Sequence, residues 1–203
     1  MSITTSENRL YIIFVFVAVL TFVVRFGEDL FRYIKRRRPA KSNHKSGSDY
    51  RVVPLESVQR YIHECIELAK MATCRRSRCG SVIVSPNGVI VGQGFNSMPL
   101  CVDEACFKDS IPKDFKSDRT CCIHAEQRAI MNAGKFNTVG CRLYFVRIDE
   151  NDKPVSCGEP YCTMCSKMAL DAGIVSFVLY HDDGMRAYEA NHYNKLSFQY
   201  QGK

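Results

Sequence analysis

The sequence "GEPYCTMCSKMAL", residues 158–170, places Cys162 and Cys165 three residues apart, shortly after Pro160. Proline is favoured near the start of a helix and glycine just after its end, so we predict a helix here that ends before Gly173. A cysteine pair at a helix start can form a disulfide, pack as a buried apolar couple or supply half of a metal site. Other motifs in the sequence are needed to choose among these three interpretations.

Helices and strands alternate after residue 50, which predicts an α/β fold. Apolar residues recur at helical spacing from about residue 55 to 73, and Ser85-Pro86-Asn87-Gly88 predicts the turn of a β-hairpin. A second helix in "CIHAEQRAIMNAG" ends at Gly134, and the strands "CRLYFVRID" and "IVSFVLY" lie on either side of the helix at Cys162. This order predicts a mixed sheet with a parallel portion that is covered by helices.

His124, Ala125 and Glu126 stand at the start of the second predicted helix. Residues two apart point in nearly opposite directions around a regular helix, but at the N-terminus both can approach a target near the helix axis. Cys162 and Cys165 have the same relation to their own helix. Two helix starts can therefore meet at one ion.

One histidine and two cysteines supply three protein ligands, the number that leaves a tetrahedral zinc ion with an open position for water. The positive ends of the two helices favour thiolate over thiol. A carboxylate that is not a ligand, such as Glu126, can take a proton from that water and pass it to a leaving group. This combination predicts a catalytic zinc site.

The His-x-Glu sequence, followed by proline and the Cys-x-x-Cys pair, resembles the signature of the zinc-dependent cytidine and deoxycytidylate deaminase superfamily. The resemblance runs from about residue 57 to 180. It includes "CGSVIVSPNGVIVGQGFNSMP", which is similar to the hairpin and loop of deoxycytidylate-type deaminases, and "AGIVSFVLY", which is similar to their closing strand.

The resemblance implies a cytidine deaminase-like, three-layer α/β/α fold and the hydrolytic deamination of a cytosine-containing nucleotide or nucleoside, such as dCMP or cytidine, with release of ammonia. It implies Zn²⁺ as the cofactor and a possible homo-oligomer, because the family commonly self-associates. A nucleic-acid-editing deaminase and a non-catalytic, membrane-tethered zinc module are the alternatives. The implied zinc ligands are His124, Cys162 and Cys165, the implied proton shuttle is Glu126, and the implied substrate-binding residues are Asn96 and Ala125.

Two departures from the family pattern bear on the substrate. Tyr161 separates Pro160 from Cys162, so the approach to the helix differs by one residue, and no glycine follows Pro99. The segment "CVDEACFKDSIPKDFKSDRTCC", residues 101–122, stands between the hairpin and the His124 helix. We expect it to set substrate choice, although its sequence does not reveal which substrate.

The chain contains eleven cysteines, an odd number, and a reducing compartment would keep thiols free. Four of them within residues 101–122 are candidates for a second, structural zinc ion, with ordinary buried or surface thiols as the default. Cys141 and Cys157 are predicted packing residues. The candidate set is Cys101, Cys106, Cys121 and Cys122.

Several arginine and aromatic side chains have both a substrate-binding interpretation and a structural one. Arg75, Arg76 and Arg78 can meet a substrate phosphate or form a solvated loop. Four aromatic residues near the C-terminus can stack on bases, although packing of a terminal helix against the sheet is favoured. These are Tyr188, Tyr193, Phe198 and Tyr200. Histidines other than His124 are expected to be satisfied by hydrogen bonds or exposed.

Residues 10–24, "LYIIFVFVAVLTFVV", carry no charge. At about 1.5 Å per residue they span about 22 Å as a helix, short of the roughly 30 Å hydrocarbon core, so a span here is thin or strained. Basic residues are concentrated after this run, which predicts a single-pass membrane protein with its C-terminal part cytoplasmic. Residues 1–50 are therefore predicted to be an anchor and linker before a deaminase domain of residues 51–203, with an interfacial helix or a signal peptide as alternatives.

The net charge of +7 is concentrated in the same N-terminal region. Nine of the 28 basic and four of the 21 acidic residues fall within residues 1–50, which leaves 19 against 17, or +2, for the rest of the chain. A domain that binds nucleic acid should have a basic surface of its own. Nucleic acid is therefore an unlikely partner, and a small-molecule substrate is expected.

Overall fold

The computed structural model describes residues 49–74, 76–101, 106–107, 110 and 120–200, together with the isolated positions 21, 24, 25 and 27. The chain divides into two units, Met1–Asn43 and His44–Lys203, and the fold below is that of the second. Within the described residues, no helix combines the length and the apolar character that crossing a membrane requires. Most of the predicted anchor, residues 10–24, lies outside the described part of the chain, and the predicted boundary at residue 50 stays a prediction.

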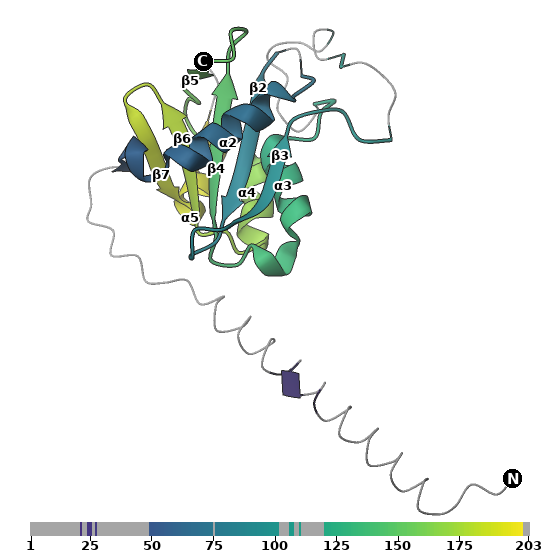
Figure 1. The fold of residues 1–203 in the computed structure, drawn as a ribbon, viewed down its shortest axis with the longest axis vertical. Coiled ribbons are helices and arrows are strands. Elements are labelled where there is room, and N and C mark those ends of the chain that lie inside the picture. The colour runs from purple at the N-terminus through teal and green to yellow at the C-terminus, as the bar shows by residue number, and fades with distance from the viewer. Residues whose placement is uncertain are drawn as a thin grey trace, which may run out of the picture. The chain divides into compact units, whose positions relative to one another are not determined.

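Seven strands form one mixed sheet in the order β1-β7-β6-β4-β2-β3, with β5 paired to β4 (Figure 1). β4 and β6 run parallel, and every other pair is antiparallel. The mixed sheet with one parallel pair confirms the fold predicted from the alternation of helices and strands. The strands are β1 (Arg51–Val53), β2 (Arg78–Val84), β3 (Ile90–Phe95), β4 (Arg142–Ile148), β5 (Pro154–Val155), β6 (Ser176–His181) and β7 (Gly184–Glu189).

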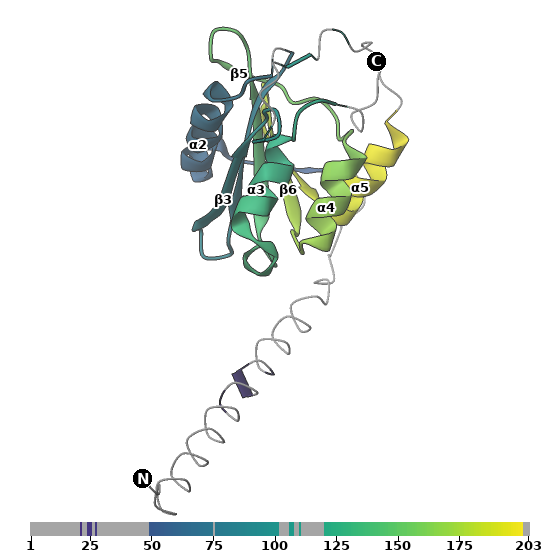
Figure 2. The same ribbon diagram turned by 90° about the vertical axis from the view of Figure 1, so that its right-hand side faces the viewer.

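Helices cover both faces of the sheet and make a three-layer α/β/α arrangement (Figure 2). α2 (Gln59–Lys70) packs on one face, where one apolar cluster lies between it and the sheet. α3 (Ala125–Ala133), α4 (Thr163–Asp171) and α5 (Ala190–Gln199) cover the other face over a second cluster. Two short 3-10 helices, η1 (Leu55–Ser57) and η4 (Lys135–Asn137), complete the described elements.

The first helix begins later and ends earlier than predicted. The pattern indicated one helix from about 55 to 73, whereas the structure has η1, a break at Val58 and then α2. Val58 adopts φ −128° and ψ 3°, outside the helical region, and its buried side chain belongs to the core. The apolar spacing correctly predicts a buried face of the helix. It also includes Val58, which is buried but lies outside the helix.

The C-terminal aromatic residues divide between core and surface. Tyr188 on β7 and Tyr193 on α5 are buried, and Tyr193 stacks on Phe177 with ring centroids 4.0 Å apart. Phe198 and Tyr200 are exposed. The expected packing of a terminal helix is therefore confirmed for Tyr193, whereas Phe198 and Tyr200 lie outside that contact.

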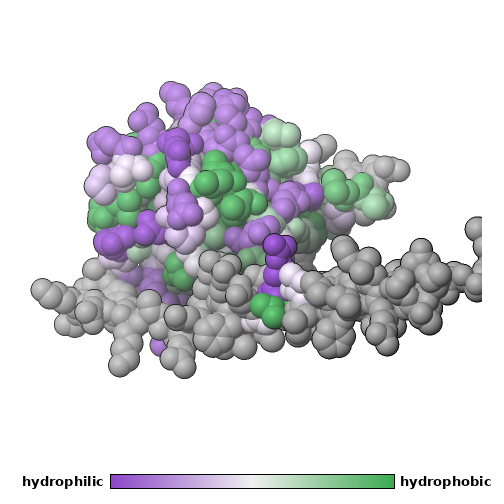
Figure 3. Space-filling model, turned by 60° about the horizontal axis from the view of Figure 1, so that its bottom comes forward, coloured by the Kyte–Doolittle hydropathy of each residue, from purple (hydrophilic) through white to green (hydrophobic). Residues whose placement is uncertain are grey.

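Described side chains on the face shown in Figure 3 alternate between hydrophilic and hydrophobic groups. Exposed apolar residues such as Met131 and Phe136 lie at the C-terminal end of α3 and in η4. This distribution identifies no partner. The possible homo-oligomer stays a prediction.

Two glycines allow α3 to lie directly on β3. A side-chain carbon at Gly92 would be 2.4 Å from the Ala129 carbonyl oxygen, and one at Gly94 would be 2.4 Å from the Ala125 carbonyl oxygen. Real Cβ atoms do not approach backbone so closely, so only glycine fits at these two positions. Because Ala125 follows His124, this close contact fixes the height of the α3 N-terminus above the sheet.

We predict that Gly94→Ala lowers the free energy of unfolding by about 1–3 kcal/mol, because the added methyl group collides with the α3 backbone. Thermal or urea unfolding of the purified protein measures the change. Gln93→Ala is the matched control, since the Gln93 side chain is exposed on the opposite face of β3. Equal stability of the two variants would contradict the close packing of α3 on β3.

Candidate metal centre

His124 stands immediately before α3 with extended backbone angles, φ −69° and ψ 153°. Its carbonyl oxygen accepts the first helical hydrogen bond from the Arg128 N–H (3.0 Å), and its own N–H donates to Gln127 Oε1 (3.0 Å). A glutamine three residues after the cap is one half of a capping box, so Gln127 is a positioning residue that the sequence pattern could have revealed. The imidazole is thereby held at the positive end of α3.

Cys162 and Cys165 occupy the corresponding positions at α4. Cys162 precedes the helix with φ −87° and ψ 98°, its carbonyl oxygen accepts from the Ser166 N–H, and its Sγ accepts from the Cys165 N–H at 3.4 Å. Both sulfurs are buried, with exposures of 2% and 0%. Tyr161, the extra residue before the pair, is partly exposed, and its ring centroid lies 5.8 Å from that of Tyr200. Burial and the nearby Glu126 raise the pKa of its hydroxyl group, so this additional residue lies beside the candidate metal centre.

The two helix starts meet at a single point. His124 Nδ1 lies 3.2 Å from Cys165 Sγ and 3.4 Å from Cys162 Sγ, and the three ligand atoms lie within 4.8 Å of one another. Zinc–nitrogen and zinc–sulfur bonds of about 2.0 and 2.3 Å place such atoms about 3.6 Å apart in a tetrahedral site. The predicted ligands His124, Cys162 and Cys165 therefore fit a zinc ion in both chemistry and spacing.

Glu126 lies in the first turn of α3 and is 7% exposed. Burial raises the pKa of its carboxyl group to about 7, and the neighbouring His124 partly opposes the shift. A carboxyl group with a pKa near neutrality can accept a proton and later donate it. Glu126 therefore combines proximity to the ligand group with the acid–base properties that a proton shuttle needs.

A hydrogen bond couples the two sulfurs. The hydrogen bond from Cys165 lowers the pKa of Cys162 to about 4, with His124 contributing, whereas acting as that donor raises the pKa of Cys165. Metal binding requires both sulfurs as thiolates, so it is favoured as pH rises.

Of the two predicted substrate-binding residues, Ala125 begins α3 beside His124, and Asn96 lies in the loop after β3. Asn96 follows β3 and is buried, with Oδ1 accepting from the Cys79 N–H (2.8 Å) and Nδ2 donating to the Ser77 carbonyl oxygen (2.7 Å). The next residue, Ser97, forms a β-bridge with Ile123, so this loop lies beside the start of α3. The structure shows Asn96 holding the Ser77–Cys79 backbone; its contact with a sugar stays a prediction.

The structure gives contacts for several of the other side chains considered above, and Arg78 lies on β2 and not in a loop. Arg78 pairs with Asp152 at 2.7 Å, and His181 is buried with Nδ1 3.0 Å from Ser156 Oγ. Cys141 and Cys157 are buried in the apolar cluster beneath α3 and α4, which confirms their packing role. Arg75 lies outside the described residues.

Comparison with known families agrees with this geometry. The model of the cytidine and deoxycytidylate deaminase zinc-binding region matches residues 55–181, which include the three ligands and Glu126. The chain belongs to this family. The resemblance deduced from the His-x-Glu and Cys-x-x-Cys motifs is thereby confirmed, and zinc is the metal of this domain.

Individual relatives show how far the similarity extends. Deoxycytidylate deaminases from Homo sapiens and Pongo abelii are each 30% identical over 118 residues, covering 52% of this chain and 56% of theirs. The chain thus spans about half the length of the curated relatives it matches. Among solved structures, dCMP deaminase from the cyanophage S-TIM5 in complex with dCMP and dUMP aligns with a TM-score of 0.43 at 21% identity, covering 62% of this chain and 81% of that one. Cytidine deaminase from Burkholderia pseudomallei aligns with a TM-score of 0.46 at 14% identity, covering 66% and 94%.

Removing one ligand should release zinc from this centre. We predict that His124→Ala and Cys165→Ser each lower the zinc content by one ion per chain, because two remaining protein ligands bind the metal weakly. Elemental analysis of protein purified under reducing conditions provides the measurement. Cys141→Ser, a change at a buried cysteine in the core, is the control and should retain the full zinc content. Unchanged zinc in the two ligand variants would contradict the assignment.

Proposed function

We propose that the domain catalyses hydrolytic deamination of a cytosine-containing nucleotide or nucleoside, such as dCMP or cytidine, to the uracil form. The observation that carries this proposal is a buried, non-ligand carboxyl group, Glu126, in the same helical turn that begins at the metal-binding His124. A purely structural zinc site would normally have a fourth protein ligand and has no use for such an acid.

The metal and the protein would contribute different steps of the proposed deamination. A zinc ion held by His124, Cys162 and Cys165 would make water easier to ionise at neutral pH. Glu126 would accept one proton from the attacking water and donate it to the ring nitrogen N3 as the water oxygen bonds to C4 of cytosine. Glu126 would then accept the remaining proton from the C4 hydroxyl group and donate it to the amino group, so that the C4–N bond breaks and ammonia and the uracil form leave.

The family membership and the deoxycytidylate deaminase relatives support a small nucleotide as the substrate. The near balance of charge after residue 50 supports the same conclusion, because a polynucleotide requires many phosphate contacts. An editing deaminase that acts on an unpaired base is the second candidate. The specific observation in its favour is segment 101–122, which differs from the deoxycytidylate-type pattern beside the site.

A substrate panel separates the two candidates. We expect the full-length protein to release ammonia from at least one of dCMP, deoxycytidine and cytidine, and to leave cytosine in single-stranded oligonucleotides unchanged. Coupled ammonia detection and mass spectrometry of the oligonucleotides are the two measurements. Uracil formation in oligonucleotides alone would favour the editing enzyme.

Glu126→Gln tests the proposed role of the carboxyl group. The amide has nearly the same shape but cannot transfer the proton, so we expect kcat to fall by about 10²–10⁴-fold while the zinc content is retained. Met131→Leu, a change at an exposed residue near the C-terminal end of the same helix, is the control. Full activity in Glu126→Gln would rule out this mechanism.

We further propose that residues 10–24 anchor the chain to a membrane as a single pass, with the deaminase domain on the cytoplasmic side. The support is the uncharged sequence and the basic residues that follow it. This arrangement would keep nucleotide deamination at a membrane surface.

Val17→Arg should weaken this anchor, because an arginine near the centre of a membrane helix costs about 2.5–3.5 kcal/mol. We expect the full-length protein to remain with membranes after alkaline extraction and Val17→Arg to shift toward the soluble fraction. Asn43→Arg, in the predicted linker, is the control. Complete solubility of the unchanged protein would contradict the anchor.

A further inference from the structure

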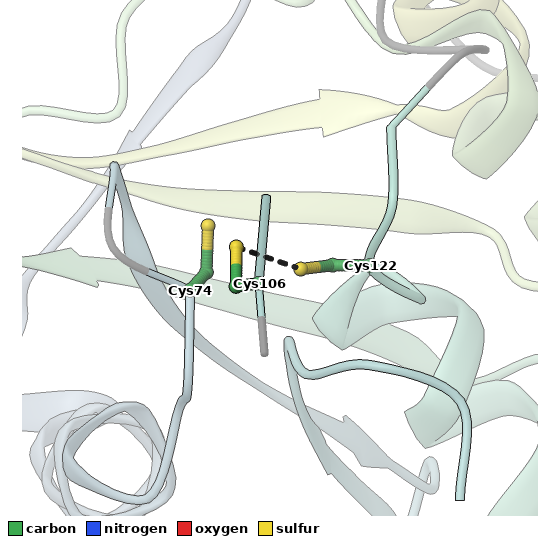
Figure 4. Close-up of side chains that lie close together, drawn as sticks. All are labelled: Cys74, Cys106 and Cys122. Carbon is green, nitrogen blue, oxygen red and sulfur yellow. Dashed lines mark hydrogen bonds between the residues drawn. The ribbon is translucent and has the colours of Figure 1, made fainter. Parts of the chain in front are cut away.

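A second group of cysteines lies apart from the catalytic centre. The sulfur atoms of Cys74, Cys106 and Cys122 lie within 4.8 Å of one another, and Figure 4 shows the three side chains close together, with Cys122 directed toward Cys106. Cys74 follows α2, Cys106 belongs to segment 101–122, and Cys122 is two residues before His124. Three separate parts of the chain therefore bring thiols to one place.

A fourth cysteine borders this group. Cys121 Sγ lies 3.7 Å from Cys106 Sγ and 3.8 Å from Cys122 Sγ, and Cys106 Sγ lies 3.9 Å from Cys122 Sγ. A tetrahedral zinc ion with Zn–S bonds of about 2.3 Å separates its sulfur ligands by about 3.8 Å. A disulfide would require a separation of about 2.05 Å. The spacing matches sulfurs around a shared ion.

These cysteines also differ from the packing cysteines in their surroundings. Cys65, Cys79, Cys141 and Cys157 are members of the two apolar clusters that fill the faces of the sheet, whereas none of the four grouped cysteines belongs to either cluster. Cys106 and Cys121 are only partly buried. Burial of apolar surface therefore does not explain why four thiols gather here.

We propose that Cys74, Cys106 and Cys122 bind a structural zinc ion, with Cys121 supplying the fourth sulfur. Four thiolates are a standard ligand set for zinc sites that stabilise a fold and leave no open position. Cys74 replaces Cys101 in the set expected from the sequence, since Cys101 is exposed. Cys121 is retained because its sulfur lies close to those of Cys106 and Cys122.

The proposed site would fasten segment 101–122 to the domain beside the catalytic centre. One end of the connection is Cys74, four residues after the end of α2, and the other end adjoins Ile123, whose N–H donates to the Ser97 carbonyl oxygen at 2.9 Å. Arg128 of α3 also donates to the Met98 carbonyl oxygen at 3.1 Å. A zinc ion here would therefore restrict the segment that we expect to choose the substrate.

Zinc content of the full-length protein tests the proposal. Two ions per chain are expected in the unchanged protein, and one in each of Cys74→Ser, Cys106→Ser and Cys122→Ser. Cys101→Ser, in the same segment, is the matched control and should retain two. Cys162→Ser should also retain one ion, so loss of the catalytic metal and loss of the second site are counted separately.

Cobalt spectroscopy can test the second group without changing its cysteines. The result then does not depend on whether variants of Cys74, Cys106 or Cys122 fold. The double variant Cys162→Ser/Cys165→Ser removes both catalytic thiolates and leaves the second group intact. After loading with Co²⁺, this protein should show the sulfur-to-cobalt charge-transfer bands of a thiolate site, and adding Cys121→Ser should weaken them. Absence of these bands in the double variant would overturn the proposal, as would a disulfide among the four cysteines found by mass spectrometry of the unchanged protein. Bands unaffected by Cys121→Ser would overturn the assignment of the fourth ligand.

Discussion

The approach of two helix N-termini to one point is the constraint on which the rest of the structure depends. His124 at α3 and Cys162 at α4 come from segments 38 residues apart, and their ligand atoms are 3.4 Å apart. Each helix contributes backbone polarity that favours anionic sulfur, and each is held on the same face of the sheet by the cluster beneath α3, α4 and α5. The parallel pairing of β4 with β6 supports this arrangement, because α4 connects those two strands.

Close packing between β3 and α3 positions residues of the candidate metal centre. Glycines at positions 92 and 94 let the α3 backbone approach the strand, and the same helix carries His124 before its first turn and Glu126 within it. These glycines therefore help to set the positions of the candidate metal ligand His124 and of Glu126, the proposed proton shuttle. Gln127, through its bond to the His124 N–H, acts in the same way from within the helix.

The meeting of His124, Cys162 and Cys165 could be predicted from the sequence because its signal is local. The His-x-Glu and Cys-x-x-Cys motifs each specify residue type, spacing and a place at a helix start, so only the meeting of two helices remained to be shown. The second cysteine group lacked such a signal: Cys74 and Cys106 are 32 residues apart, and only the folded chain brings them together. Short edge elements were missed for a related reason. β1 has three residues and β5 has two, too few for a periodic pattern, and their pairing partners decide their structure.

The exposure of Cys101 has a practical consequence. It is the one exposed thiol among the eleven, while the other cysteines are buried or partly buried. A maleimide dye or spin label should therefore react at Cys101 first and leave sulfurs that hold a metal untouched. Such a probe would be attached at the beginning of segment 101–122 without any substitution in the sequence.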